Sequence, residues 1–216
     1  MSHPSHRRSV VLASASPARL QTLRAAGVHP SVTVSGVDES AYVSLPPADQ
    51  ALALARAKAH AVAMLAETAD TLVVGCDSVL DLDGRAFGKP VDAAEATRRW
   101  RSMRGRTGVL VTGHCLIDNR RGRNREAVAR TIVHFADVSD DEIAAYVSTG
   151  EPLHVAGAFT LDGLGGAFVT GIEGDPHNVV GISLPLLREM LADIAVPWTD
   201  LWTAGSGPPG QPDSRS

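Results

Sequence analysis

Hydroxyl and cationic side chains gather where the first apolar run of the chain ends. Residues 10–13 are apolar, Ser14 and Ser16 follow them, and Arg19 comes three residues later. Ser16 and Pro17 are typical of the N-cap and the first position of a helix. A strand that leads into a helix N-terminus directs free N–H groups toward one point, which suits an anion. Taken alone, the segment is more typical of an ordinary strand–helix corner.

A single carboxylate interrupts the most apolar run of the sequence. Residues 72–80 are mostly apolar, and Asp77 lies among them. A carboxylate in a buried strand is costly unless it is paired, hydrogen-bonded or bound to a metal, so Asp77 is a candidate metal ligand or general base. The alternative is an aspartate facing water at the strand edge. Cys76 is a rival nucleophile, although small buried cysteines usually serve only in packing.

Two lysines and one acid extend this candidate chemistry. Lys89 lies between a glycine and a proline, and such a stiff turn presents an ammonium well to a phosphate oxygen. Lys58 lies in a helix rich in alanine and leucine and is expected to project into a cleft. Glu39, at the end of the second expected strand, could complete a divalent metal site with Asp77. The alternative for Lys89 is a solvated surface lysine, and for Lys58 it is a lysine at the edge of a helix. The alternative for Glu39 is a position in a solvated loop.

The elements that must position these residues alternate between strand and helix, which predicts an α/β fold. Helices are expected after Pro17, Pro47, Asp92, Ser139 and Ser183, and the expected strands are 10–13, 32–35, 72–82, 85–87, 109–117, 127–135 and 166–172. Capping boxes are expected to begin at Asp92 and at Ser139. Tight hairpins are expected at residues 83–84 and 119–125, so the sheet is predicted to be mixed.

Composition restricts the class of protein. The formal charge of -4 argues against general binding to nucleic acid or to an anionic membrane. No apolar stretch approaches the length of a membrane span, and two cysteines fit a reducing compartment, so we expect a cytoplasmic protein. The last residues, 204–216, have the composition of a disordered tail.

These motifs follow one another in an order that strongly resembles the Maf family of nucleoside triphosphate pyrophosphatases. The resemblance covers roughly residues 10–191 and rests on motifs at residues 14–19, 75–79, 88–90, 105–107, 112–113, 149–153, 156–159, 163–165 and 178–185, together with the helix that contains Lys58. We therefore expect one domain over residues 8–195. It should be a single elongated α/β domain with a central mixed sheet flanked by helices and two lobes around a cleft, like inosine-triphosphate pyrophosphatases.

The resemblance implies a function and a set of site residues. It implies hydrolysis of a nucleoside triphosphate to the monophosphate and pyrophosphate with a divalent cation, Mg²⁺ or Mn²⁺, and clearance of non-standard nucleotides. Asp77 matches the catalytic carboxylate, and Glu39 matches an acid that assists the metal. The positions that match phosphate contacts are Ser14, Ser16, Arg19, Lys58 and Lys89.

Three positions depart from the usual motifs of the family. Ala18, Ser78 and Asp162 replace residues that the family associates with base selection, so the preferred base stays open. The partner expected from the resemblance is the nucleotide, with a homodimer as the expected assembly. The alternative functions are a non-catalytic, nucleotide-binding regulator of cell division and a cysteine hydrolase that uses Cys76.

Overall fold

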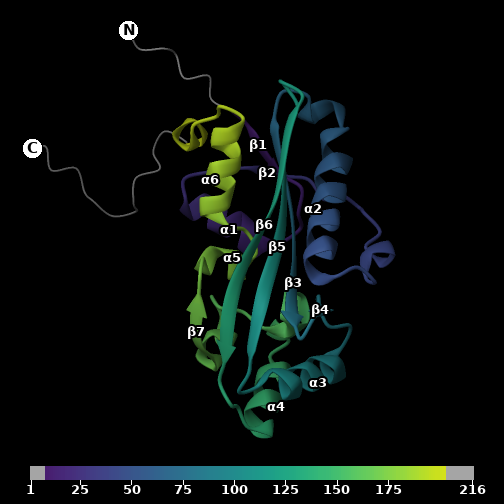
Figure 1. Cartoon of the computed structure of the whole chain (residues 1–216), viewed down its shortest axis with the longest axis vertical. Helices are drawn as coiled ribbons and strands as arrows, with labels where there is room; N and C mark the ends of the chain where they lie inside the picture. Colours follow the sequence, from purple (N-terminus) through teal and green to yellow (C-terminus); the bar gives the residue numbers. More distant parts are fainter. Residues whose placement is uncertain (1–7, 203–216) are drawn as a thin grey trace, which may run out of the picture.

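The alternation of strands and helices expected from the sequence is present in the computed structural model, which describes residues 8–202 (Figure 1). The strands are β1 (Val10–Leu12), β2 (Ser31–Val32), β3 (Leu72–Leu82), β4 (Arg85–Phe87), β5 (Thr107–Asp118), β6 (Arg123–Phe135) and β7 (Val169–Glu173). The helices are α1 (Pro17–Ala25), α2 (Pro47–Ala63), α3 (Ala93–Met103), α4 (Asp140–Ser148), α5 (Pro176–Val180) and α6 (Leu184–Asp193). Short 3-10 helices are η1 (Ser40–Tyr42), η2 (Ala66–Thr68), η3 (Glu151–His154), η4 (Ala156–Ala158), η5 (Leu164–Phe168) and η6 (Trp198–Leu201).

The strands form one mixed sheet of seven strands in the order β2-β1-β3-β5-β6-β7, with β4 paired to β3. The pairs β1–β2 and β1–β3 are parallel, whereas β3, β5, β6 and β7 pair antiparallel. The predicted α/β class and mixed sheet are therefore confirmed. The long strands β3, β5 and β6 run through most of the molecule and give it an elongated shape (Figure 1).

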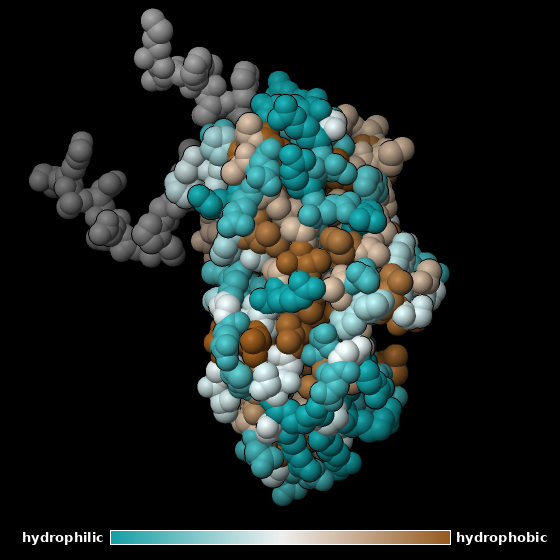
Figure 2. All heavy atoms as spheres, in the orientation of Figure 1, coloured by the Kyte–Doolittle hydropathy of each residue, from teal (hydrophilic) through white to brown (hydrophobic). Residues whose placement is uncertain are grey.

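One edge of β3 is paired discontinuously. The other edge pairs with β5 from Leu72 to Asp81. On this edge β1 pairs with residues 72–74 and β4 pairs with residues 80–82. Among the described residues, 75–79 have no strand partner there, and this interval contains Asp77. This gap lies between the two ends of the molecule. Figure 2 shows a notch in the outline of the molecule between the η1 segment and the end that carries α3 and β4.

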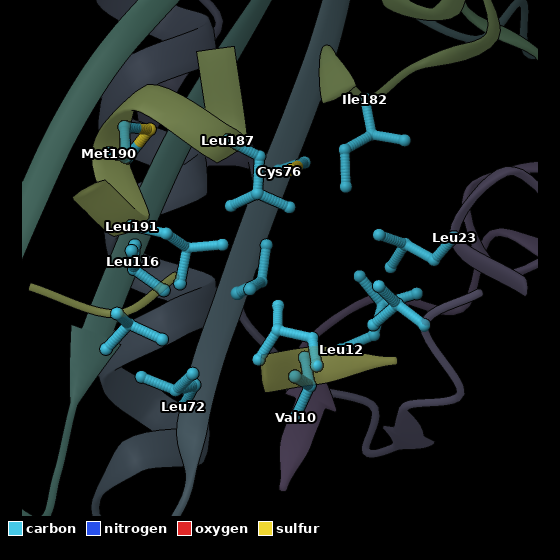
Figure 3. Close-up of a cluster of buried hydrophobic side chains, with 14 of the residues drawn as sticks. Val10, Leu12, Leu23, Leu72, Cys76, Leu116, Ile182, Leu187, Met190 and Leu191 are labelled. Carbon is cyan, nitrogen blue, oxygen red and sulfur yellow. The ribbon is translucent and has the colours of Figure 1, made fainter. Parts of the chain in front are cut away.

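Each end of the molecule has its own apolar core. Leu72, Val74 and Cys76 of β3 pack with β1, α1 and α6 in one cluster, part of which Figure 3 shows. Leu80 and Leu82, farther along β3, pack with α4 and with residues of α3, including Trp100, in a second cluster. β3 and β5 contribute to both cores, so they join the two predicted lobes.

Helix α2 covers the opposite face of the sheet at very short range. A Cβ atom on Gly75 would overlap the carbonyl oxygen of Ala55, and one on Gly113 would overlap the backbone of Ala51. The two glycines therefore let the helix backbone touch β3 and β5 directly. This close approach decides how far the side chains of α2 reach over the sheet.

Most of the local predictions are confirmed. The turn between β3 and β4 has positive φ angles at both Asp83 and Gly84, as the tight hairpin requires. Ser16 caps α1 by accepting from the N–H of Arg19, and Ser139 forms a complete capping box with Glu142. The second hairpin is also present, but its turn is shorter than the predicted 119–125, because β5 ends at Asp118 and β6 begins at Arg123.

Three local predictions were wrong in detail. The second strand is Ser31–Val32 and not 32–35, because β1 is short and offers little edge to pair with. The last strand begins at Val169 and not at residue 166, because Leu164–Phe168 form the 3-10 helix η5, whose first two N–H groups donate to the Glu151 carboxylate. The box at Asp92 is half-formed, since the Glu95 carboxylate accepts from the N–H of Val91.

Two further sequence predictions concern the C-terminal tail and membrane-spanning segments. The predicted tail, 204–216, lies outside the described residues. No helix within residues 8–202 combines the length and the apolar composition needed to cross a bilayer.

Replacing Gly113 by alanine tests the contact between α2 and the sheet. The added methyl group would overlap the Ala51 backbone, which cannot move without shifting α2. We expect Gly113→Ala to lower the free energy of unfolding by about 1–3 kcal/mol, measured by urea denaturation. The matched control is Gly88→Ala, since a Cβ atom there meets nothing within 4 Å. Equal stability of the two variants would contradict the packing described.

Candidate active site

The gap in the edge of β3 contains an ion-pair cluster centred on Lys58. The Lys58 ammonium lies 2.6 Å from Oδ1 of Asp77 and 2.7 Å from Oε1 of Glu39. The side chains of Lys58 and Asp77 are each 12% exposed, whereas that of Glu39 is 56% exposed. The cluster therefore runs from the buried strand outward to the loop after β2, and it brings together three of the residues predicted from the sequence.

Burial dominates the electrostatics of Asp77. Desolvation raises the pKa of this carboxyl, while the positive charges of Lys58 and Arg19 act in the opposite direction. The nearby Glu39 carboxylate raises the pKa further. The alternative of a solvated Asp77 at the strand edge is therefore wrong: the side chain is buried and paired.

Two carboxylates share one ammonium here, so the cluster keeps a formal negative charge. Carboxylate oxygens are the ligands that Mg²⁺ and Mn²⁺ prefer, and Mg²⁺ sites commonly use one or two carboxylates plus phosphate oxygens and water. Oδ1 of Asp77 and Oε1 of Glu39 contact the same Nζ atom, so the two carboxylates face a common point. The donor set therefore fits the expected divalent cation.

Arg19 occupies the other side of β3. Its Nε donates to the carbonyl oxygen of Gly181 at 2.7 Å, and its terminal nitrogens donate to Oγ of Ser14 at 2.9 Å and to Oγ of Ser78 at 3.0 Å. Arg19 is 8% exposed. Because side chains alternate along a strand, Ser78 faces Arg19 while Asp77 faces Lys58. Arg19 therefore ties the loop before α1 to β3 and to the segment after α5.

The loop before α1 is shaped by its own hydroxyl groups. Oγ of Ser14 accepts from the backbone N–H of Ser16 at 3.2 Å, and Oγ of Ser16 accepts from the N–H of Arg19 at 3.4 Å. These bonds hold the N-terminus of α1 beside the gap in β3. Among the predicted phosphate contacts, Ser14, Ser16 and Arg19 thus form one connected group.

Behind Arg19 and Ser78 lies a buried polar network, whose members other than Ser78 were not assigned a role from the sequence. Ser78 pairs with the hydroxyl of Thr112 at 2.9 Å, and Thr112 donates to the carbonyl of Asn178. The ring of His114 accepts from the N–H of Ser183 at 2.9 Å. Polar side chains in the apolar run 109–117 were the available signal, and it is the same signal that pointed to Asp77.

Three predicted site residues lie outside these two groups. Lys89 is exposed, and its turn is held by Arg99, whose guanidinium donates to the Gly88 and Lys89 carbonyls. Asp162 is exposed and lines a hollow of about 350 Å³ between α1, α5 and the start of α6. Ala18 is half-buried on α1, and its carbonyl accepts from the hydroxyl of Thr22, which also lines that hollow.

Cys76 is unsuited to act as a nucleophile. Its side chain is fully buried in the core shared by β1, α1 and α6 (Figure 3). Desolvation, the largest effect on this thiol, raises the pKa of Cys76 to about 12. The thiolate is the nucleophilic form of cysteine, so the hydrolase that uses Cys76 finds no support in the structure.

The chain is similar to known proteins over most of its length. The family model described as Maf-like protein matches residues 9–194. This chain belongs to the Maf family. It is 61% identical over 199 residues to a protein from Streptomyces coelicolor named nucleoside triphosphate pyrophosphatase, which covers 92% of this chain and 97% of the relative. A relative of the same name from Salinispora tropica is 62% identical, covering 91% and 88%, and one from Cutibacterium acnes is 54% identical, covering 91% and 96%.

The buried ring of His114 predicts a loss of stability in acid. Burial is the main cause that lowers the pKa of His114 from 6.5 to about 4. Between these values the unfolded chain binds a proton that the folded chain does not, so stability falls as the pH drops from 6.5 to 4. The shift corresponds to about 3 kcal/mol.

His114→Gln removes this titration but keeps an acceptor for Ser183. We expect the difference in unfolding free energy between the wild-type protein and the variant to shrink by about 3 kcal/mol between pH 7 and pH 4. Urea denaturation at several pH values measures it. A difference that stays constant with pH would show that His114 is not a buried neutral ring.

Proposed function

We propose that this Maf-family protein hydrolyses a nucleoside triphosphate to the nucleoside monophosphate and pyrophosphate. The observation that carries the proposal is the Lys58 ammonium held between Asp77 and Glu39, with Arg19 of α1 bound to the neighbouring Ser78 on β3. A triphosphate requires cations and N–H donors from several segments, and this gap supplies them. The relatives from three organisms are named nucleoside triphosphate pyrophosphatase, which supports the same reaction.

The phosphate groups are proposed to bind between Lys58 and the loop before α1. Arg19 has five N–H groups and uses three of them for protein oxygens, so each terminal nitrogen keeps one N–H for a phosphate oxygen. Ser14 and Ser16 accept bonds from the loop with their hydroxyl oxygens, and their own protons can be donated to the substrate. Lys89, exposed at the other end of the gap, is proposed to reach the outer phosphates.

Asp77 and Glu39 would hold the divalent cation, Mg²⁺ or Mn²⁺. When bound, this cation offsets negative charge on the phosphates as the anhydride bond breaks. Oδ1 of Asp77 accepts from Lys58, while Oδ2 has no hydrogen-bond partner within the described residues and is not fully buried. Oδ2 is proposed to accept the proton of the attacking water.

The reaction then balances without a further reactant. The water oxygen forms a bond to the α-phosphorus, and the bond from that phosphorus to the bridging oxygen of the leaving group breaks. The electron pair leaves with pyrophosphate, and the water proton passes to Asp77. The raised pKa of Asp77, caused first by burial, makes this carboxylate a better proton acceptor than a solvated one.

The substrate scope is proposed from the residues near α1. Asp162 and Thr22 line the hollow beside the helix that carries Ala18, and Ser78 lies against Arg19. We propose that Ala18, Ser78 and Asp162 select the base. We also propose that the protein clears non-standard nucleotides in the cytoplasm. The catalytic domain is proposed to span residues 8–195, and the active protein to be a homodimer.

Asp77→Asn tests the assignment of the base. The amide keeps the size of the side chain but cannot accept a proton, so we expect the rate of pyrophosphate release to fall by about 10²–10⁴-fold. A panel of common and methylated nucleoside triphosphates with Mg²⁺ or Mn²⁺ should be used. The matched control is Cys76→Ala, the preceding residue on the same strand, which should change the rate little.

Each alternative function gives a different result in the same assay. Release of orthophosphate would contradict the cleavage position. Nucleotide binding without turnover across the panel would favour a non-catalytic regulator. A large loss of activity in Cys76→Ala with full activity in Asp77→Asn would favour the cysteine hydrolase.

Glu39→Gln tests the metal assignment. The amide removes one negative ligand, so we expect the Mg²⁺ concentration for half-maximal activity to rise by about 10-fold or more, as even indirect changes at metal sites cost 10–100-fold. Asp38→Asn is the matched control, since Asp38 accepts from the N–H of Ser40 and makes no ion pair with Lys58. An equal shift in both variants would contradict a specific role for Glu39.

A further inference from the structure

Three metal-binding side chains converge on the face of the sheet that α2 covers. His60 comes from α2, Cys115 from β5 and Glu126 from β6, and one ligand atom of each lies within 4.8 Å of the other two. Cys115 and Glu126 are direct partners across the β5–β6 ladder. None of the three belongs to the phosphate or metal site proposed above.

We propose that His60, Cys115 and Glu126 form a second metal site, which binds a transition metal ion such as Zn²⁺. One imidazole, one thiolate and one carboxylate supply three ligands, and water completes a tetrahedron. A sulfur ligand favours Zn²⁺ or Co²⁺ over Mg²⁺, which prefers oxygen. This donor set therefore differs in kind from Asp77 and Glu39.

The geometry needs only a small adjustment of side chains. Ligand atoms around a tetrahedral Zn²⁺ ion are about 3.3–3.8 Å apart, given metal–ligand distances of about 2.0–2.3 Å. The present separations are at most 4.8 Å, so the three atoms must close by about 1 Å. His60 is exposed and Glu126 is half-buried, and both can move toward the buried Cys115.

The order of burial also provides a route for the ion. His60 is exposed to solvent, the Glu126 side chain is 21% exposed, and Cys115 is fully buried. An ion arriving from solvent meets the imidazole and carboxylate before the sulfur. When the Zn–S bond forms, the thiol of Cys115 releases its proton to solvent, so no oxidant or reductant is needed.

Arg56 competes with a metal ion for the Glu126 carboxylate. Its Nε donates to Oε1 of Glu126 at 2.8 Å, and a terminal nitrogen donates to Oε2. The guanidinium thus occupies the carboxylate and adds a positive charge beside the site. Replacement of Arg56 by glutamine should therefore increase the metal affinity, a result that a fortuitous grouping of side chains does not predict.

An occupied site would tie α2 to the β5–β6 hairpin. Lys58 lies two residues before His60 on the same helix, and on an α-helix this spacing places them on different sides. The metal would therefore hold α2 from the side away from the Lys58–Asp77 pair. Ligands that bind only the folded state stabilise it, so Zn²⁺ should raise the melting temperature.

The test is titration of the full-length protein with Co²⁺, a spectroscopic substitute for Zn²⁺, followed by competition with Zn²⁺. We expect a thiolate-to-cobalt charge-transfer band in the wild-type protein, which Zn²⁺ abolishes. In His60→Ala the affinity should fall by about 100-fold or more, because loss of a direct ligand exceeds the 10–100-fold cost of indirect changes. Cys115→Ala should lose the band, and Arg56→Gln should bind more tightly.

Two controls separate this site from the proposed active site. Cys76→Ala should keep the band, since Cys76 lies in the core on the other side of the sheet. Asp77→Asn should also keep it, whether or not that variant hydrolyses nucleotides. His60 is exposed, so His60→Ala tests the site even where Cys115→Ala unfolds. Absence of the band in the wild-type protein, or its full retention in His60→Ala, would overturn the proposal.

Discussion

Helix α2 lies directly on the backbone of β3 and β5, because Gly75 and Gly113 carry no side chains at the contact. This closeness lets a lysine of α2 reach a carboxylate that itself points out of the sheet. Lys58 and Asp77 meet at 2.6 Å in a largely buried place. With larger residues at the two glycines the helix would stand farther away, and Asp77 would be a buried charge without a partner. Most features of the site depend on this contact.

The second constraint is the interrupted edge of β3. Strands β1 and β4 pair with its two ends and leave residues 75–79 without a strand partner there, among the residues described. The gap gives a ligand access to the middle of a central strand. Arg19 bridges it on one face through Ser14, Ser78 and the Gly181 carbonyl, and Lys58 reaches it on the other. A site between two cores is therefore held rigid by polar contacts.

Burial of Asp77 in the site also lowers the stability of the folded protein. Burial raises the pKa of Asp77, so ionisation of this carboxyl opposes folding above its ordinary pKa. The same burial makes Asp77 useful as a proton acceptor in the proposed reaction. Beside α2, His60 of the helix and Glu126 of β6 gather around the buried sulfur of Cys115 on β5, which is inert without a metal. The fold thus uses α2 on both sides, with oxygen chemistry on one and sulfur chemistry on the other.

Much of this protein follows from local sequence. The Asp83–Gly84 turn, the Ser16 cap and the Ser139 capping box depend on contacts between near neighbours, and for this reason the sequence predicts them. The order of motifs also indicated the Maf family and the candidate residues. The short edge strand and the start of β7 were predicted less well, because β1 and Glu151 decide them from elsewhere in the chain.

Only the tertiary structure decided which candidates meet. Lys58, Asp77 and Glu39 are separated along the chain, and no local pattern could show that one ammonium would contact both carboxylates. The same applies to Arg19 with Ser78, and to His60 with Cys115 and Glu126. Side-chain types and turns are properties of short segments, whereas convergence depends on the depth at which α2 packs and on the register of β3, β5 and β6. The order of residues along the chain therefore sets which chemical groups are available, and packing sets where they are assembled.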